Sequence, residues 1–155
     1  MPLELKVQYA AIFISLAALA YNYKGMKPFI PVALFASLYA NIWCYLSTYF
    51  NWWEFPIRTV PLIQDISFTA NVIVVPILAM FWVRYSPMSR VKWAFLWTTL
   101  LTVPEYILER YTDTIKYHNS YEWYYSYLLW LISWFIWYQF HKWFYNDCKT
   151  GHQTH

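Results

Sequence analysis

The chain has 155 residues, of which 60% are hydrophobic, 25% aromatic and 12% charged. A soluble domain carries about 25% charged residues, and a chain of this size has too little interior to bury 11 Trp, 16 Tyr and 11 Phe side chains. The composition excludes an ordinary soluble domain and predicts an all-α, integral membrane helical bundle. The net charge of +3 is small and the basic residues are scattered, so no surface for nucleic acid is expected.

Five apolar runs are long enough, or nearly so, to cross a hydrocarbon core of about 30 Å, which takes roughly 20 helical residues. The first run lacks the basic start and the cleavage site of a signal peptide, so we interpret it as a retained helix. In chain order, the predicted transmembrane spans are residues 7–23, 29–50, 65–83, 91–109 and 121–145. They form a single domain, and membrane lipids are its expected partners.

Prolines, small residues and charges within and between these spans predict local departures from five straight, uniform helices. Residues 51–64 contain two prolines and a mixture of tryptophans and charges, which predicts an interfacial segment rather than a helix. In the second span, Ala33, Ser37 and Asn41 recur every four residues and predict a small, polar face for close helix contact. Pro76 is expected to kink the third span, and Pro104 the fourth.

Basic residues of short loops favour the cytoplasm. With five spans, four basic residues fall on the side of the N-terminus and seven on the other side. This predicts an N-terminus outside and a C-terminus in the cytoplasm. Seven of the eight acidic residues fall on the outer side, which suggests a cation-attracting or acid/base site there.

Glu105 and Glu109 provide the sharpest functional signal. Their spacing of four places both carboxylates on one face of a helix, and a carboxylate within a span costs about 2.5–3.5 kcal/mol on insertion scales. One carboxylate of such a pair can donate a proton while the other accepts it. Alternatively, Glu109 reaches the headgroups and Glu105 pairs with Arg58 or Arg110 for structural reasons alone.

Asp65, at the start of the third span, is a candidate N-cap for that helix. If the third and fourth helices are neighbours, Asp65 also approaches Glu105, where Gln64, Asn71 and Arg58 are able to join them. Such a site suits a protonated amine, a divalent cation or acid/base chemistry on a lipid. We expect no metal or cofactor, because Cys44, Cys148 and the histidines form no ligand cluster.

The fifth span carries more aromatic residues than interfacial belts require. Trp130, Trp134 and Trp137 share one face at mid-membrane, where their rings can either pack against other helices or stabilise a cation. His118 is either a solvated loop residue or a proton shuttle. The predicted ligand-binding set is Arg58, Asp65, Glu105, Glu109, Arg110, Trp123, Trp130 and Trp134, and the predicted catalytic set, if the protein is an enzyme, is Glu105, Glu109 and Asp65.

Several short motifs occur at characteristic spacings in the last two-thirds of the chain. They are Phe55-Pro56-x-Arg58, Asp65, Pro104-Glu105-x-x-x-Glu109, Thr112-x-Thr114-Ile115-x-Tyr117 and Glu122-Trp123-x-Tyr125. This pattern resembles a poorly characterised family of small multi-pass membrane proteins from spore-forming Firmicutes. The sequence departs from the family at Phe55, where Tyr is common, and at Glu122, where Gly often precedes the Trp. The resemblance implies a bacterial cell membrane but supplies no mechanism.

Three functions follow as hypotheses. The first is binding of a cationic or amphipathic small molecule or lipid in an outer-facing acidic, aromatic-lined cavity. The second is an intramembrane enzyme that uses the carboxylates for acid/base chemistry on a lipid or isoprenoid. The third is a structural or accessory membrane subunit, alone or as an oligomer.

Overall fold

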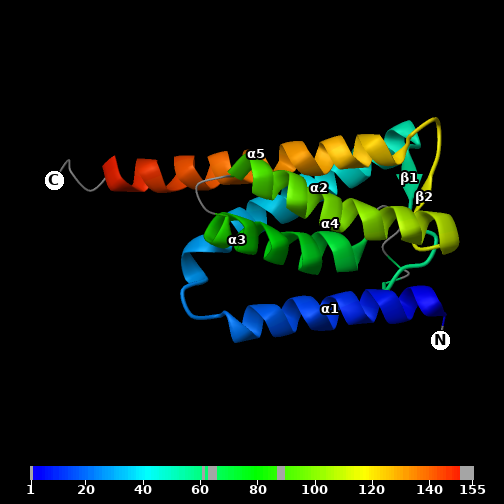
Figure 1. The fold of residues 1–155 in the computed structure, drawn as a ribbon, viewed down its shortest axis with the longest axis horizontal. Helices are drawn as coiled ribbons and strands as arrows, with labels where there is room; N and C mark the ends of the chain where they lie inside the picture. Colours follow the sequence, from blue (N-terminus) through cyan, green and yellow to red (C-terminus); the bar gives the residue numbers. More distant parts are fainter. Residues whose placement is uncertain (1, 61, 63–65, 87–89, 151–155) are drawn as a thin grey trace.

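The computed structural model describes residues 2–60, 62, 66–86 and 90–150, with side chains as far as residue 146. Within these residues the fold is all-helical apart from one two-stranded ribbon (Figure 1). The α-helices are α1 (Leu3–Tyr21), α2 (Ile30–Phe50), α3 (Val75–Tyr85), α4 (Arg90–Tyr111) and α5 (Trp123–Thr150). A 3₁₀ turn, η1 (Lys27–Phe29), precedes α2, and a π-helix, η2 (Thr69–Val74), precedes α3.

The helices alternate in direction along one long axis. The N-terminus and the strands lie at one end of the bundle, which we call the strand end (Figure 1). The α1–α2 connection, the end of α3 and the start of α4 lie at the opposite end, which we call the turn end. The start of α1, the end of α4 and the start of α5 therefore all lie at the strand end.

The helix boundaries differ from the ends of the predicted spans by a few residues. The first helix begins at Leu3, directly after Pro2, and ends at Tyr21 rather than at residue 23. The third begins in the π-helix at Thr69 and continues to Tyr85, because Pro76 lies in the first turn of α3, where its missing N–H is tolerated. The fifth begins at Trp123 and extends to Thr150.

The core lies where α2, α3, α4 and α5 meet. Trp82, Trp134 and Trp137 are almost completely buried there, and small residues such as Ala36 and Ala79 let the helices approach closely. The Trp82 indole N–H donates to the Trp134 carbonyl at 2.7 Å. Helix α1 lies apart from this core, packs on η2 and α3, and buries only Gln8 among its described residues.

The predicted small and polar face of α2 is confirmed as a helix contact. Ala33 is buried, and the Ser37 hydroxyl donates to the Asn71 carbonyl at 2.7 Å. The Asn41 side-chain oxygen accepts from Asn71 Nδ2 at 3.0 Å. Helix α2 thereby holds the π-helix in place.

The segment 51–64 includes a strand, which the sequence did not indicate. Asn51 ends α2 in the left-handed conformation, with φ of 52°, and turns the chain back toward the bundle. β1 (Trp53–Glu54) then pairs antiparallel with β2 (Lys116–Tyr117), so that Trp53 lies opposite Tyr117. The ribbon connects the end of α2 to the loop between α4 and α5.

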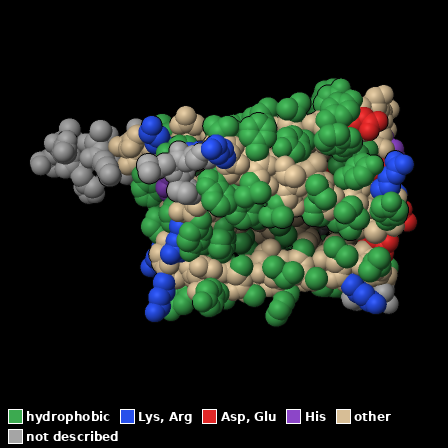
Figure 2. All heavy atoms as spheres, in the orientation of Figure 1, with side chains coloured by type: hydrophobic (Ala, Val, Ile, Leu, Met, Phe, Trp, Pro, Cys, Tyr) green, Lys and Arg blue, Asp and Glu red, His purple; other side chains and the backbone are tan. Residues whose placement is uncertain are grey.

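The surface has an unusual distribution of side chains. In Figure 2, hydrophobic side chains cover the middle of the visible face, while charged side chains gather toward the two ends. Many large apolar side chains are exposed, for example Phe13, Leu34, Leu100 and Ile132. Within the described part of the chain, Leu3–Tyr21 and Lys27–Phe50 are the helices long and apolar enough to cross a membrane, and Thr69–Tyr85 is apolar but shorter.

Candidate functional site

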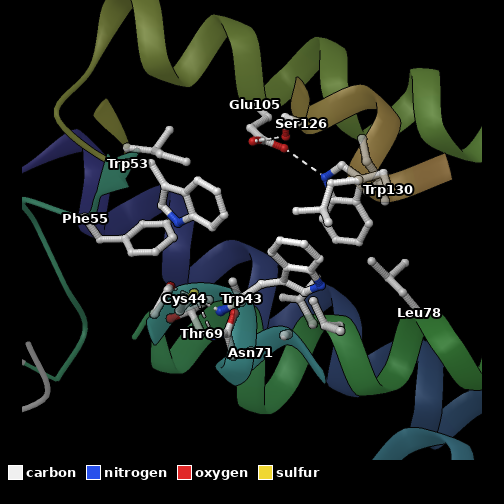
Figure 3. A pocket seen from close by; sticks show the side chains of 18 of the residues that line it. Trp43, Cys44, Trp53, Phe55, Thr69, Asn71, Leu78, Glu105, Ser126 and Trp130 are labelled. Carbon is white, nitrogen blue, oxygen red and sulfur yellow. Dashed lines mark hydrogen bonds between the residues drawn. The ribbon is translucent and has the colours of Figure 1, made fainter. Parts of the chain in front are cut away.

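A cavity of about 310 Å³ lies between the helices, toward the strand end of the bundle. Its walls come from all five helices, the π-helix and the loops next to the ribbon. Aromatic side chains form much of the lining, including Trp43, Trp53, Phe55 and Trp130 (Figure 3). Among the described residues, Glu105 is the only charged residue that lines it.

The Glu105 carboxylate is held by three neutral donors. Oε1 accepts hydrogen bonds from the Tyr117 hydroxyl and the Ser126 hydroxyl, each at 2.6 Å. Oε2 accepts one from Trp130 Nε1 at 3.0 Å. These donors take the place of water around the carboxylate but bring no positive charge, since none of them is cationic. Oε2 accepts a single hydrogen bond and so retains capacity for another donor.

Each of these side chains is placed by simple local geometry. Pro104 precedes Glu105, also lines the cavity, and leaves the Leu100 carbonyl without its helical donor. Ser126 and Trp130 are four residues apart on α5, so they present their donors from one face. Tyr117 is positioned by the pairing of β2 with β1.

The Tyr117 hydroxyl remains a donor across the neutral pH range. Burial, together with the negative charge of Glu105 and the hydrogen bond to it, raises the pKa of Tyr117 well above its usual value. The phenol therefore keeps its proton, and the Tyr117–Glu105 hydrogen bond persists wherever the ribbon is formed.

The wall opposite Glu105 is also polar. Cys44, Thr69 and Asn71 lie on the far side of the aromatic side chains (Figure 3). Asn71 is only 4% exposed, and its Nδ2 donates to Asn41 Oδ1 at 3.0 Å and to Cys44 Sγ at 3.1 Å. Both amide protons are used, so the Asn71 Oδ1 atom is the part of this side chain that can accept from a ligand.

A directed chain of hydrogen bonds runs behind the same wall. The Ile57 carbonyl can only accept, and Gln8 Nε2 donates to it at 2.7 Å. Gln8 Oε1 therefore accepts from the Thr59 hydroxyl at 2.6 Å. Because Thr59 has one hydroxyl proton, Thr69 must donate to Thr59 in the hydrogen bond between their hydroxyl groups. Thr69 Oγ1 is left with lone pairs only.

The structure separates the residues predicted to form the site. Glu105 and Trp130 line the cavity and contact each other. Glu109, one turn further along α4, is half-buried and does not line it. Arg58 is half-buried and Arg110 exposed, and neither forms an ion pair with Glu105.

The other predicted residues have different surroundings. Trp134 is fully buried in the core, where it donates to Thr98 Oγ1 at 3.0 Å, and Trp123 is 46% exposed at the start of α5. Asp65 and Gln64 lie outside the described residues. The rings of Trp130 and Trp134 stack with centroids 5.9 Å apart, so the tryptophan face both lines the cavity and fills the core.

His118 and the cysteines form no further site among the described residues. The His118 Nε2 atom lies 3.0 Å from Glu54 Oε1, and both residues are partly exposed to solvent at the ribbon. Cys44 is buried with a free thiol. The described residues contain no group of three or more His, Cys, Asp or Glu side chains arranged to hold a metal ion.

Comparisons with models of protein families, with curated proteins and with solved structures find no match to this chain. The resemblance noted in the sequence therefore stays a prediction. The cavity and the residues around it are the features that bear on function.

Sequence reasoning missed Tyr117, Ser126, Gln8 and Thr69. Gln8 had a usable signal, since a lone amide inside an apolar run requires a hydrogen-bond partner. Tyr117 stands in one of the motifs of the resemblance, but tyrosine is frequent in the last third of the chain, so this position was not distinguished from the other tyrosines. Ser126 had no local signal. Asn71 was expected beside Glu105 but lies on the opposite wall (Figure 3).

Proposed function

We propose that this protein spans a membrane and binds a cationic, amphipathic small molecule or lipid in the cavity beside Glu105. The exposed apolar side chains between two charged ends support the membrane setting, because soluble proteins rarely expose such extensive apolar surface. Helices α1 and α2 are apolar and have 19 and 21 residues, about 28 and 32 Å of helix, which matches a hydrocarbon core of about 30 Å.

The distribution of basic residues supports an orientation. The turn end holds Lys24, Lys27, Arg84, Arg90, Lys92 and Lys142, and no acidic side chain among those described there. Among the side chains that the structure describes, the strand end holds four basic ones and all of the acidic ones. We place the turn end in the cytoplasm and the cavity near the outer face. The resemblance to Firmicute proteins suggests a bacterial cell membrane.

The observation that carries the binding proposal is the unneutralised charge of Glu105. A carboxylate enclosed by aromatic walls and neutral donors, with no basic residue lining the same cavity in the described part of the chain, leaves a net negative charge in a poorly solvated site. A cation gains most from such a site, because its charge replaces the missing counter-ion. Aromatic faces around it add about 0.5–2 kcal/mol per contact with the cation.

Acid/base catalysis has weaker support. The predicted acid/base pair needs both of its carboxylates near the reacting atoms, and Glu109 does not line the cavity. Binding is therefore the function we propose, and catalysis on a lipid or isoprenoid is the alternative.

The test compares a cation with its neutral analogue. The protein is reconstituted in lipid nanodiscs and titrated calorimetrically with n-octylamine and n-octanol, with empty nanodiscs subtracted. We expect octylamine to bind the wild type at least tenfold more tightly than octanol. Glu105→Gln keeps the shape of the side chain but removes the charge, and should abolish this preference.

Glu109→Gln is the matched control, since it makes the same change one turn along α4 outside the cavity, and it should keep the preference for octylamine. Equal binding of both compounds to the wild type would overturn the proposal. Amine binding that survives in Glu105→Gln would also overturn it and would favour the catalytic alternative, in which the carboxylate acts on the substrate without setting its affinity.

A further inference from the structure

The cavity has a second polar wall that a simple alkylamine does not use. We propose that its ligand is an amino alcohol with an apolar middle, whose ammonium group binds Glu105 and whose hydroxyl group donates to the wall formed by Thr69 and Asn71. This inference rests on the proposed function and specifies the class of ligand.

The polarity of the second wall follows from its own hydrogen bonds. The chain from Thr69 through Thr59 to Gln8 uses the Thr69 proton, and Asn71 uses both of its amide protons on Asn41 and Cys44. The strong hydrogen-bonding groups that Thr69 and Asn71 have left for a ligand are therefore acceptors. A ligand group that meets them has to be a donor.

Thr69 and Asn71 belong to the π-helical segment and are each only 4% exposed, and both line the cavity. π-Helical turns are rare and are found frequently at functional sites. This one is kept in register by the hydrogen bond from the Ser37 hydroxyl of α2 to the Asn71 carbonyl.

The space between the two polar walls is apolar. In Figure 3 the side chains of Trp43, Trp53 and Trp130 lie between Glu105 on one side and Thr69 and Asn71 on the other. The middle of the ligand therefore has to be apolar, since any polar group there would lose its hydration without gaining a partner.

A hydroxyl suits the second wall better than a second ammonium. Glu105 is the only charged residue among the described ones lining the cavity, so a second cation at Thr69 and Asn71 would be buried without a counter-ion. A neutral donor gains the hydrogen bond without this penalty. A diamine is thus disfavoured relative to an amino alcohol of equal length.

The test uses ω-amino alcohols with six to twelve carbons and the n-alkylamines of the same lengths, titrated into the protein in nanodiscs. Variants are compared with the wild type for each compound, so that partitioning into the lipid cancels. The ligand hydroxyl has one proton, so at the best chain length the variant that removes its acceptor, either Asn71→Leu or Thr69→Val, should weaken the amino alcohol about fivefold, the value of one net hydrogen bond. Both variants should leave binding of the alkylamine within twofold of the wild type.

Thr102→Val is the matched control, since Thr102 is buried in α4 but does not line the cavity, and it should change neither ligand. Amino alcohol binding that is insensitive to both Thr69→Val and Asn71→Leu at every length would overturn the inference. The proposed function would still stand in that case, provided that alkylamine binding depends on Glu105. Absence of binding by every amine would instead contradict the proposed function itself.

Discussion

Glu105 on α4 and Trp130 on α5 are joined by a hydrogen bond of 3.0 Å, in which the indole N–H donates to the carboxylate Oε2. The two residues are 25 positions apart in the chain and both line the cavity. The bond therefore couples the charge of the cavity to the packing of α4 against α5.

The first prediction concerns this pair. In a double-mutant cycle of Glu105→Gln and Trp130→Phe, we expect a coupling free energy of unfolding of about 1.5–3 kcal/mol, the range for hydrogen bonds to charged groups. Unfolding in mixed detergent micelles with increasing denaturing detergent measures it. Trp143→Phe, at an exposed position toward the far end of α5, should combine additively with Glu105→Gln. If the changes in unfolding free energy also add for Glu105→Gln and Trp130→Phe, the hydrogen bond between these residues contributes nothing to stability.

The second prediction concerns alkaline pH. The pKa of Tyr117 is raised in the folded protein above the ordinary value of 10.0, so the folded state keeps a proton that the unfolded state loses. The stabilising contribution of Tyr117 is complete below about pH 10 and decreases above it, by at most about 1.4 kcal/mol per pH unit.

Tyr117→Phe removes this titration. The variant should be less stable than the wild type at pH 8, because Glu105 loses a donor, and the difference in melting temperature should shrink between pH 9.5 and about 11. Melting curves followed by circular dichroism measure it. Parallel pH profiles for the two proteins would contradict the expected role of the Tyr117 hydroxyl.

The third prediction concerns the tryptophan core. Trp82 is completely buried and its indole N–H donates to the Trp134 carbonyl, so Trp82→Phe loses both volume and a hydrogen bond. We expect the free energy of unfolding to decrease by about 2 kcal/mol. Trp143→Phe makes the same change at an exposed position and should alter stability by less than about 0.5 kcal/mol.

The fourth prediction concerns orientation. Pro56 lies near the ribbon and Lys24 in the α1–α2 connection, and both are exposed. In a Cys44→Ala, Cys148→Ser background, Pro56→Cys should react with a membrane-impermeant maleimide on intact cells. Lys24→Cys should react only after the cells are permeabilised. The reverse labelling pattern would place the strand end in the cytoplasm.

The helical architecture followed from local sequence properties. The apolar runs, the prolines and the four-residue stripe on α2 each act within one or two helical turns, so they are readable in the chain. The same is true of Glu105, which is conspicuous because a carboxylate in an apolar run is costly. The ribbon was not predicted, because β1 and β2 have two residues each and their pairing depends on how α2 and α4 end.

By itself, the sequence determined a helical chain with acidic residues concentrated at one end and a carboxylate of interest at position 105. Only the tertiary structure decided which partners Glu105 has. Its donors come from β2 and α5. Glu109 is on the same face of α4 but one turn further along, outside the cavity, because the position of the neighbouring elements along the helix axis decides which side chains meet. The direction of the Gln8–Thr59–Thr69 hydrogen bonds likewise required α1 to be placed beside the segment from Thr59 to Thr69, and it leaves an acceptor on the second wall.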